Sequence, residues 1–168
     1  MTIYVALLRA VNVGGTGKLP MMELRAMCEA AGFMRARTYL ASGNVVFDVD
    51  APADRVKATL ERALEAYAGK PVGVMVRTGP EMAAILAANP FATSVSNRTM
   101  AIFLDDPPLA GSLADVSGRQ DEEVALGARE IYVHYPNGMG NSKLRIPAAR
   151  RGTARNMNTV ATLAEWAA

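Results

Sequence analysis

The chain has 168 residues, enough for one domain or for two small halves that share a core. Hydrophobic residues make up 51% and charged residues 20%, a balance typical of a folded globular protein. Eighteen Lys and Arg against sixteen Asp and Glu give a formal charge of +2, too small to predict nucleic-acid binding from charge alone. One cysteine excludes an internal disulfide, and no apolar stretch is long enough to cross a bilayer. No signal peptide precedes the first predicted strand, so the expected location is the cytoplasm.

The first twenty residues contain an apolar run, a glycine-rich loop and a helix start. The run at 3–9 predicts a buried strand, and a helix is predicted over 20–31. Backbone N–H groups of such a loop, together with Lys18, can hold an anion. The phosphate-loop pattern is nevertheless incomplete, because Asn12 and Leu19 stand where it needs a glycine and a hydroxyl residue. The dinucleotide pattern also lacks its third glycine.

The rest of the first half adds three strands and one helix. In chain order they are strands at 36–40 and 45–49, a helix between Pro52 and Gly69, and a strand at 72–77. Strand-helix-strand-strand-helix-strand is the order of the ferredoxin-like split unit, in which the first and third strands are antiparallel neighbours. The loop at 12–18 should therefore share one end of the sheet with the turn at 41–44.

The second half repeats part of this order. Thr78 and Glu81 predict a capping box for a third helix that ends before Pro90. After a connection at 91–98, the predicted elements are a strand at 99–104, a short helix at 109–114, strands at 121–126 and 130–135, and helices at 141–148 and 155–167. The expected fold class is α+β, with a ferredoxin-like βαββαβ lobe at 1–90 and a smaller ferredoxin-like or related α+β lobe at 91–168.

Four stretches together resemble one family. They are its opening at 4–15, its hairpin at 39–47, its midpoint at 89–91 and its closing signature at 153–160. The family is the bacterial "domain of unknown function 1697" group, and the resemblance covers nearly the whole chain. The chain departs from it at Met157, where tryptophan is common, and at Ala154, where a second threonine is common. The resemblance implies a complex α+β fold with ferredoxin-like parts, and it carries no established reaction.

Basic residues in or beside glycine- or asparagine-rich turns are the first candidate ligand-binding residues. They are Arg9, Lys18, Lys143 and Arg155. Arg9 is the most unusual, because it ends an apolar strand where an unpaired charge would be costly. It could hold a phosphate or carboxylate with two hydrogen bonds, or it could form a structural ion pair or anchor the neighbouring loop.

Small and amide residues in the same turns complete the candidate ligand-binding set. They are Asn12, Gly14, Gly15, Ser42, Asn44 and Asn156. Asx turns, hairpin turns and helix caps use such residues routinely, so a structural role is the main alternative. The segment 153–159 surrounds a predicted helix start, which together with Arg155 could bind an anion or could simply cap that helix.

Other residues of types that can act in catalysis or metal binding are expected to have structural roles. His134, the one histidine, is expected to face solvent or the space between the lobes. Cys28 is expected to be a buried thiol, and Asp105 with Asp106 a solvated turn before two prolines. The spacing predicts no metal site, catalytic triad or pair of catalytic glutamates, so the sequence assigns neither catalytic residues nor a cofactor.

Three function hypotheses follow. The first is a protein, enzyme or not, that binds a nucleotide or another anionic small molecule between the two lobes, with Arg155 close to the loop at 12–18. The second is contact with nucleic acid through a ferredoxin-like sheet, although only Tyr4 and Phe47 supply aromatic rings on the central strands. The third is a structural or protein-partner role without catalysis.

Overall fold

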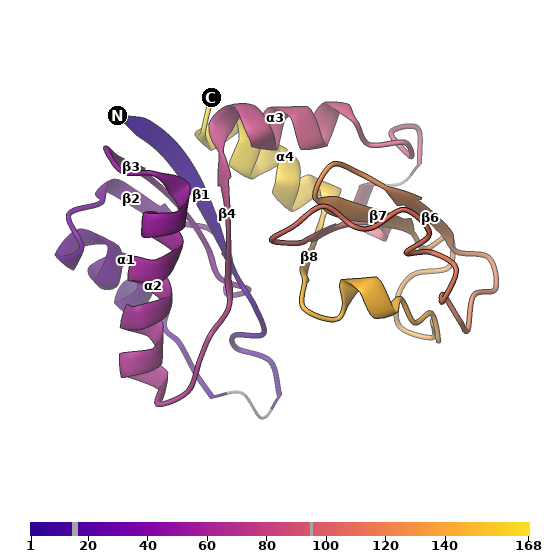
Figure 1. Ribbon diagram of the computed structural model, residues 1–168, viewed down its shortest axis with the longest axis horizontal. Helices are drawn as coiled ribbons and strands as arrows, with labels where there is room; N and C mark the ends of the chain where they lie inside the picture. The colour runs from indigo at the N-terminus through magenta and orange to yellow at the C-terminus, as the bar shows by residue number, and fades with distance from the viewer. Residues whose placement is uncertain (15–16, 95) are drawn as a thin grey trace. The chain divides into compact units, whose positions relative to one another are not determined.

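A computed structural model describes residues 1–14, 17–94 and 96–168 (Figure 1). The chain divides into two compact units, Met1–Met82 with Leu163–Ala168, and Ala83–Thr162. The end of the C-terminal helix thus belongs to the first unit, whereas the sequence predicts a single division after residue 90. No helix in the described ranges has the length and apolar character needed to cross a bilayer.

The first unit is a four-stranded antiparallel sheet with two helices on one face (Figure 1). Its elements are β1 (Thr2–Leu8), α1 (Met21–Ala30), β2 (Met34–Thr38), β3 (Asn44–Val49), α2 (Ala53–Ala68) and β4 (Val74–Thr78). The strand order is β2-β3-β1-β4, and β1 pairs with both β3 and β4. This is the order of the ferredoxin-like split unit, so the predicted arrangement is confirmed.

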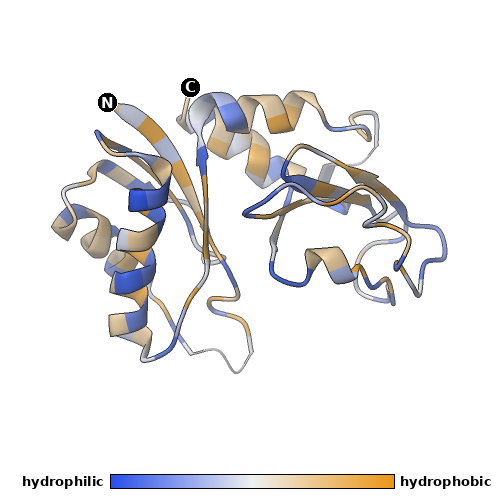
Figure 2. Ribbon diagram, in the orientation of Figure 1, coloured by the Kyte–Doolittle hydropathy of each residue, from blue (hydrophilic) through white to orange (hydrophobic). Residues whose placement is uncertain are grey.

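From Tyr4 to Leu8 both faces of strand β1 are buried. Tyr4, Ala6 and Leu8 pack in the core under the helices, whereas Val5 and Leu7 are fully buried on the opposite face. Burial on both faces produces a continuous apolar run instead of an alternating one. Figure 2 shows this run as a largely hydrophobic ribbon.

Helix α2 packs an apolar stripe onto the sheet and also covers part of the edge strand β4. Val56, Leu60 and Leu64, spaced at i, i+4 and i+8, are buried. Lys57 Nζ donates to the carbonyl oxygen of Val74 at 2.6 Å, and the Val74 N–H donates to Glu61 Oε2 at 3.1 Å. These bonds satisfy outward-facing backbone groups of an edge strand, which would otherwise be open to pairing with another chain.

The C-terminal turn belongs to the first unit because an aromatic residue anchors it there. The guanidinium carbon of Arg37 lies over the indole ring of Trp166, 3.7 Å from the centroid of that ring. The ring of Tyr39 meets the same indole edge-on, with centroids 5.2 Å apart. Such aromatic and cation–π contacts stabilise the fold by more than the buried apolar area alone would give. They hold the last turn of the C-terminal helix against the β2 side of the sheet.

The second unit contains another four-stranded antiparallel sheet. Its strands are β5 (Thr99–Phe103), β6 (Glu123–Leu126), β7 (Glu130–His134) and β8 (Thr153–Asn156), in the order β6-β7-β5-β8. This is the strand order of the first sheet, with the two crossover helices replaced by turns and a short 3₁₀ helix, η2 (Pro147–Ala149). The expected α+β class is confirmed, and the second lobe is of the related kind, with the ferredoxin-like strand order but without its crossover helices.

Two helices cross the division between the units, and a second 3₁₀ helix precedes β5. They are α3 (Gly79–Ala87), α4 (Met157–Trp166) and η1 (Ser96–Arg98). The predicted capping box at the start of α3 is confirmed, because the Thr78 N–H donates to Glu81 Oε1 at 2.8 Å and the Glu81 N–H to Thr78 Oγ1 at 3.3 Å.

Three predicted helices in the second half are wrong or misplaced. Residues 109–114 form turns. Residues 141–148 form no α-helix, because Leu144 and Ile146 pack into the core on alternate positions, Arg145 pairs with Ser117, and η2 begins at Pro147. The last helix starts at Met157 instead of residue 155, because the preceding residues pair with β5 as strand β8.

A buried carboxylate organises the turns before β6. Glu122 is 3% exposed and accepts hydrogen bonds from Ser142 Oγ at 2.7 Å and from the Gln120 N–H at 2.8 Å. The bond from Ser142 and then the backbone N–H of Gln120 lower the pKa of Glu122 from 4.5 to about 2.

This depressed pKa predicts acid-sensitive stability. The carboxylate stabilises the fold fully above its unfolded pKa near 4.5, and this contribution is lost as pH falls from 4.5 toward about 2. Urea unfolding of Glu122→Gln should show lower stability than the parent at pH 7 and a flatter dependence on pH in that window. Equal pH dependence in both proteins would contradict this role of Glu122.

Candidate functional site

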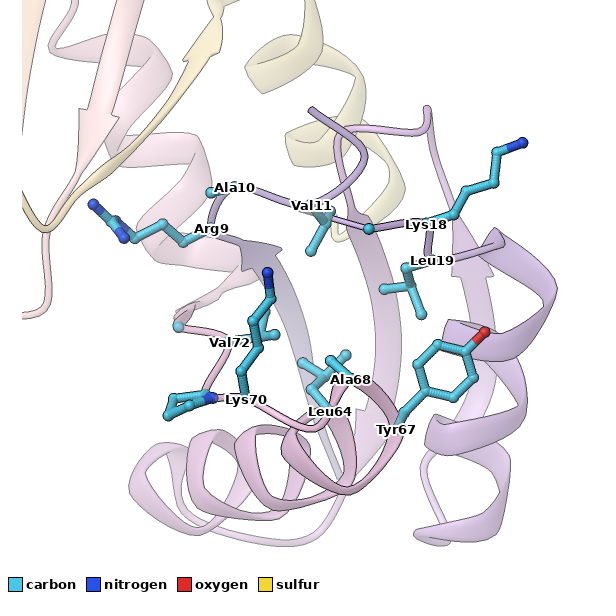
Figure 3. A pocket seen from close by; sticks show the side chains of 13 residues that line it. Arg9, Ala10, Val11, Lys18, Leu19, Leu64, Tyr67, Ala68, Lys70 and Val72 are labelled. Carbon is cyan, nitrogen blue, oxygen red and sulfur yellow. The ribbon is translucent and has the colours of Figure 1, made fainter. Parts of the chain in front are cut away.

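A pocket of about 360 Å³ lies at one end of the first unit (Figure 3). The loop that follows β1 forms one wall, and the end of α2 with the segment leading to β4 forms the other. The residues that line it are Arg9, Ala10, Val11, Gly17, Lys18, Leu19, Leu64, Tyr67, Ala68, Lys70, Pro71, Val72 and Gly73.

The floor of the pocket is apolar and belongs to the core. Val11, Leu19, Leu64 and Val72 are buried members of the cluster that packs the helices on the sheet. Tyr67, which is 46% exposed, stands at the edge of this floor (Figure 3). The pocket thus offers a fixed hydrophobic surface beside an aromatic ring that is open to solvent.

The rim of the pocket is positively charged. Arg9, Lys18 and Lys70 are exposed, and no described lining residue is acidic. Figure 3 shows the Lys70 ammonium reaching across the opening toward the loop at Ala10 and Val11, whereas Arg9 and Lys18 extend outward on opposite sides. Within the described ranges neither lysine forms an ion pair or a hydrogen bond. A concave site lined by one sign of charge raises the local concentration of ions of the opposite sign.

Asn12 closes the loop and ties it to the first hairpin. Its Oδ1 accepts from the Leu19 N–H at 2.7 Å, and its Nδ2 donates to the carbonyl oxygens of Leu19 at 2.9 Å and Ala41 at 2.8 Å. The Leu8 N–H also donates to the carbonyl of Gly43 at 2.8 Å. These bonds confirm that the loop and the hairpin turn share one end of the sheet, and they give Asn12 a structural role.

The same loop holds two residues in the left-handed region. Ala10 has φ 56° and Asn12 has φ 55°. For alanine this conformation costs about 1–2 kcal/mol, because its Cβ approaches the following carbonyl oxygen. Strained residues persist where the surrounding structure fixes them, and they cluster at ligand-binding sites.

Arg9 lies just beyond the buried strand that the sequence predicts to end with it. Strand β1 ends at Leu8, and the side chain of Arg9 is exposed. Its backbone N–H donates to the carbonyl oxygen of Gly73 at 2.9 Å, which joins the two walls of the pocket. The guanidinium is therefore presented at the rim instead of being confined at a strand end.

Other predicted residues of the first unit shape the turns next to this pocket. Asn12 and Gly14 line a wider pocket of about 780 Å³ on the far side of the loop, together with Lys18. Gly15 lies outside the described residues. Asn44 is fully buried and donates to the carbonyl oxygen of Tyr39 at 2.7 Å and to Ser42 Oγ at 3.0 Å, so both polar residues stabilise the hairpin turn.

The predicted residues of the second unit have separate environments. Arg155 is buried in β8 and donates to Thr153 Oγ1 at 2.7 Å and to the Ala154 carbonyl at 2.9 Å, and burial lowers its pKa to about 10. Asn156 Oδ1 accepts from the Thr159 N–H at 2.9 Å and so caps α4. Lys143 is exposed beside Ser117. A site that combines Arg155 with the loop at 12–18 stays a prediction.

Lys70 and Tyr67 are pocket residues that sequence reasoning missed. The sequence feature that could have identified them is Gly69, the left-handed residue that ends α2, which both residues flank. The end of α2 lies at the same end of the sheet as the β1 loop. A basic residue such as Lys70 is common directly after the C-terminal end of a helix, because it complements the partial negative charge there. The pattern alone therefore does not indicate ligand binding.

The histidine and the cysteine are both buried. His134 Nδ1 lies 3.0 Å from Thr99 Oγ1, and its ring is 6.0 Å from that of Phe91. Of the two expectations for His134, a solvent-facing ring is therefore wrong, and a position between the lobes stays a prediction. Cys28 is buried in α1 as expected, and burial, with a smaller effect of Glu29, raises its thiol pKa to about 12.

The raised pKa predicts an unreactive thiol. Because the thiolate is the reacting form, Cys28 should resist a thiol reagent at pH 8 in the folded protein and react fully in denaturant. Time-resolved labelling followed by mass spectrometry would measure both rates. Rapid modification of the folded protein would contradict the burial of this side chain.

Comparisons with known proteins support the fold and identify the family. The chain is similar to a solved structure described as the conserved bacterial protein SP0830 from Streptococcus pneumoniae, with 23% identity over 99% of both chains and a TM-score of 0.80. At that identity the likeness shows the fold. No curated protein matches the chain. The family described as "Protein of unknown function (DUF1697)" matches residues 1–132, most of the chain. The chain therefore belongs to the DUF1697 family.

Proposed function

We propose that the first unit binds a small anionic molecule with an apolar portion, in the pocket between Arg9, Lys18 and Lys70. The observation that carries the proposal is a rim of three exposed basic side chains around a buried apolar floor, with no acidic residue among the described lining residues. The cationic groups would bind a phosphate or carboxylate, and the floor with Tyr67 would cover an apolar or ring portion of the ligand.

Nucleic-acid contact through the first sheet is less well supported. Ferredoxin-like RNA-binding domains stack bases on aromatic residues of an open sheet face. Here Tyr4 is 4% exposed and Phe47 is fully buried, and both lie in the core under α1 and α2. The two aromatic residues on which that hypothesis depended are thus inaccessible to bases.

A matched set of three small molecules tests the proposal. Phenyl phosphate combines an anion with a ring, inorganic phosphate lacks the ring, and phenol lacks the charge. The proposal predicts that phenyl phosphate binds most tightly in calorimetry and raises the melting temperature most, because only a ligand of the native state stabilises it. Equal binding of phenol and phenyl phosphate would refute a site for anions.

Lys70→Gln should weaken the binding of phenyl phosphate by about tenfold or more, since hydrogen bonds to charged groups contribute about 1.5–3 kcal/mol. Arg62→Gln is the matched control, because Arg62 is exposed on α2 and does not line the pocket. If Lys70 only complements the partial negative charge at the end of α2, Lys70→Gln will lower the free energy of unfolding by a few tenths of a kcal/mol and leave ligand binding unchanged. That result would contradict the proposed function.

A further inference from the structure

A second basic surface lies in the second unit and shares no residue with the proposed pocket. It borders a shallow pocket of about 490 Å³ lined by Ser117, Gly118, Ser142, Lys143, Leu144 and Arg145. From Ile131 to Ala164 the chain contains no Asp or Glu, and its basic residues there are Lys143, Arg145, Arg150, Arg151 and Arg155. Four of the six lining residues therefore lie in a part of the sequence with basic and no acidic residues, whereas Ser117 and Gly118 lie in a segment that also contains Asp115, Asp121, Glu122 and Glu123.

The backbone of this pocket is held by a two-way pairing. The Ser117 N–H donates to the Arg145 carbonyl at 3.0 Å, and the Arg145 N–H donates to the Ser117 carbonyl at 2.8 Å. Gly118 has φ 68°, and a Cβ at this position would overlap the carbonyl oxygen of Lys143. Only glycine allows the two segments to approach this closely, so the pocket has a fixed frame.

The core fixes the direction of the two basic side chains. Leu144 and Ile146 pack against the buried cluster of Leu104 and its neighbours, while Lys143 and Arg145 alternate with them and are exposed. Extended backbone separates alternate residues by about 6.6 Å, which is close to the separation of neighbouring phosphates along a nucleic-acid strand. Within the described part of the chain neither basic side chain forms an ion pair.

The nearest buried carboxylate is already used by the protein. Glu122 accepts bonds from Ser142 and Gln120, as described above, and is 3% exposed. Arg119, adjacent to Gly118, donates from Nε to the Glu122 carbonyl at 2.6 Å, so it is anchored beside the pocket. Glu122 thus supports the frame of the pocket instead of neutralising its exposed basic groups.

We infer that Lys143 and Arg145, with Ser117 and Gly118 on the paired segment, form a phosphate-binding site in the second unit. An ammonium and a guanidinium on a rigid extended segment suit either a free phosphate compound or the backbone of a single-stranded nucleic acid. The pocket has no aromatic lining residue, so binding of a nucleic acid would be independent of sequence and sensitive to salt.

The test measures two probes at low salt: pyrophosphate by calorimetry and a fluorescent oligothymidylate by anisotropy. The double variant Lys143→Gln with Arg145→Gln should weaken binding of at least one probe by about tenfold or more. Loss for pyrophosphate alone identifies a free phosphate compound as the ligand type, and loss for the oligonucleotide identifies a polymer. Lys70→Gln should leave this component of binding unchanged, which separates the site from the pocket of the first unit.

The single variants Lys143→Gln and Arg145→Gln are measured as well, and Arg151→Gln is their control because each of the three removes one positive charge. Arg151 is exposed in the second unit but lines a different pocket with Asp105 and Asp106, where its charge is offset. The inference is overturned if neither probe binds the parent protein, or if Arg151→Gln weakens binding as much as the change at either Lys143 or Arg145. Circular dichroism of each variant would show that the fold is retained.

Discussion

Gly43→Ala should destabilise the protein by about 2–4 kcal/mol, because it combines a steric overlap with an unfavourable backbone conformation. Gly43 has φ 90°, and a Cβ there would lie 2.8 Å from Val11 Cγ2 and 2.9 Å from Leu8 Cβ. Leu8 Cβ is fixed by a central strand, so it cannot move aside cheaply. Urea unfolding monitored by circular dichroism would measure the loss.

Gly32→Ala separates the two contributions. Gly32 has a similar φ of 81°, but a Cβ there would meet nothing within 4 Å. It should therefore cost only the backbone term of about 1 kcal/mol. If both variants lose the same stability, close packing of the hairpin turn against the β1 loop is not what requires glycine at position 43.

Asn12→Ala should also cost about 2–4 kcal/mol, and it should weaken ligand binding at the pocket. The change removes three hydrogen bonds and leaves the N–H and carbonyl of Leu19, a residue that is 6% exposed, without these partners. Alanine also tolerates the left-handed region less well than asparagine. Without this closure the loop no longer holds one wall of the pocket in place.

Asn12→Asp is the graded comparison. The carboxylate keeps an acceptor for the Leu19 N–H but loses the donor to the carbonyls of Leu19 and Ala41. Its stability should fall between those of the parent protein and Asn12→Ala, whereas its phenyl phosphate affinity should fall at least as far as in Asn12→Ala, because the added negative charge repels an anion. Unchanged affinity in Asn12→Ala would show that the loop is not part of the binding site.

The fold of the first unit could be predicted from the sequence because the residues that start and end its helices are recognisable from their immediate neighbours. The prolines before α1 and α2, the glycine after α2 and the period of the apolar residues each depend on near neighbours in the chain. The prediction of a helix at 141–148 overlooked the spacing of Leu144 and Ile146, because residues two apart share a face in an extended segment and not in a helix. Pairing with Ser117, distant in sequence, also favours the extended segment.

Two arginines show why the candidate site was only partly predictable. Arg9 follows the apolar run of β1, and Arg77 follows a similar run in β4. Arg9 is exposed, whereas Arg77 is 1% exposed and donates from Nη1 to the Val76 carbonyl at 3.0 Å. Arg77 lies within β4, opposite Val5 of the central strand β1, and Arg9 lies one residue beyond β1. Strand register, which the local pattern does not encode, separates an exposed charge from a buried one.

Mapping the binding of phenyl phosphate on the ¹⁵N-labelled protein tests the central claim most directly. The account predicts that amide shifts saturate and concentrate at the residues that line the first pocket, above all Val11, Leu19, Lys70 and Val72, and that Lys70→Gln removes them. Arg62→Gln should leave them unchanged. Shifts that are absent at millimolar ligand, that lie outside the lining residues, or that persist in Lys70→Gln would contradict an anion-binding site between Arg9, Lys18 and Lys70.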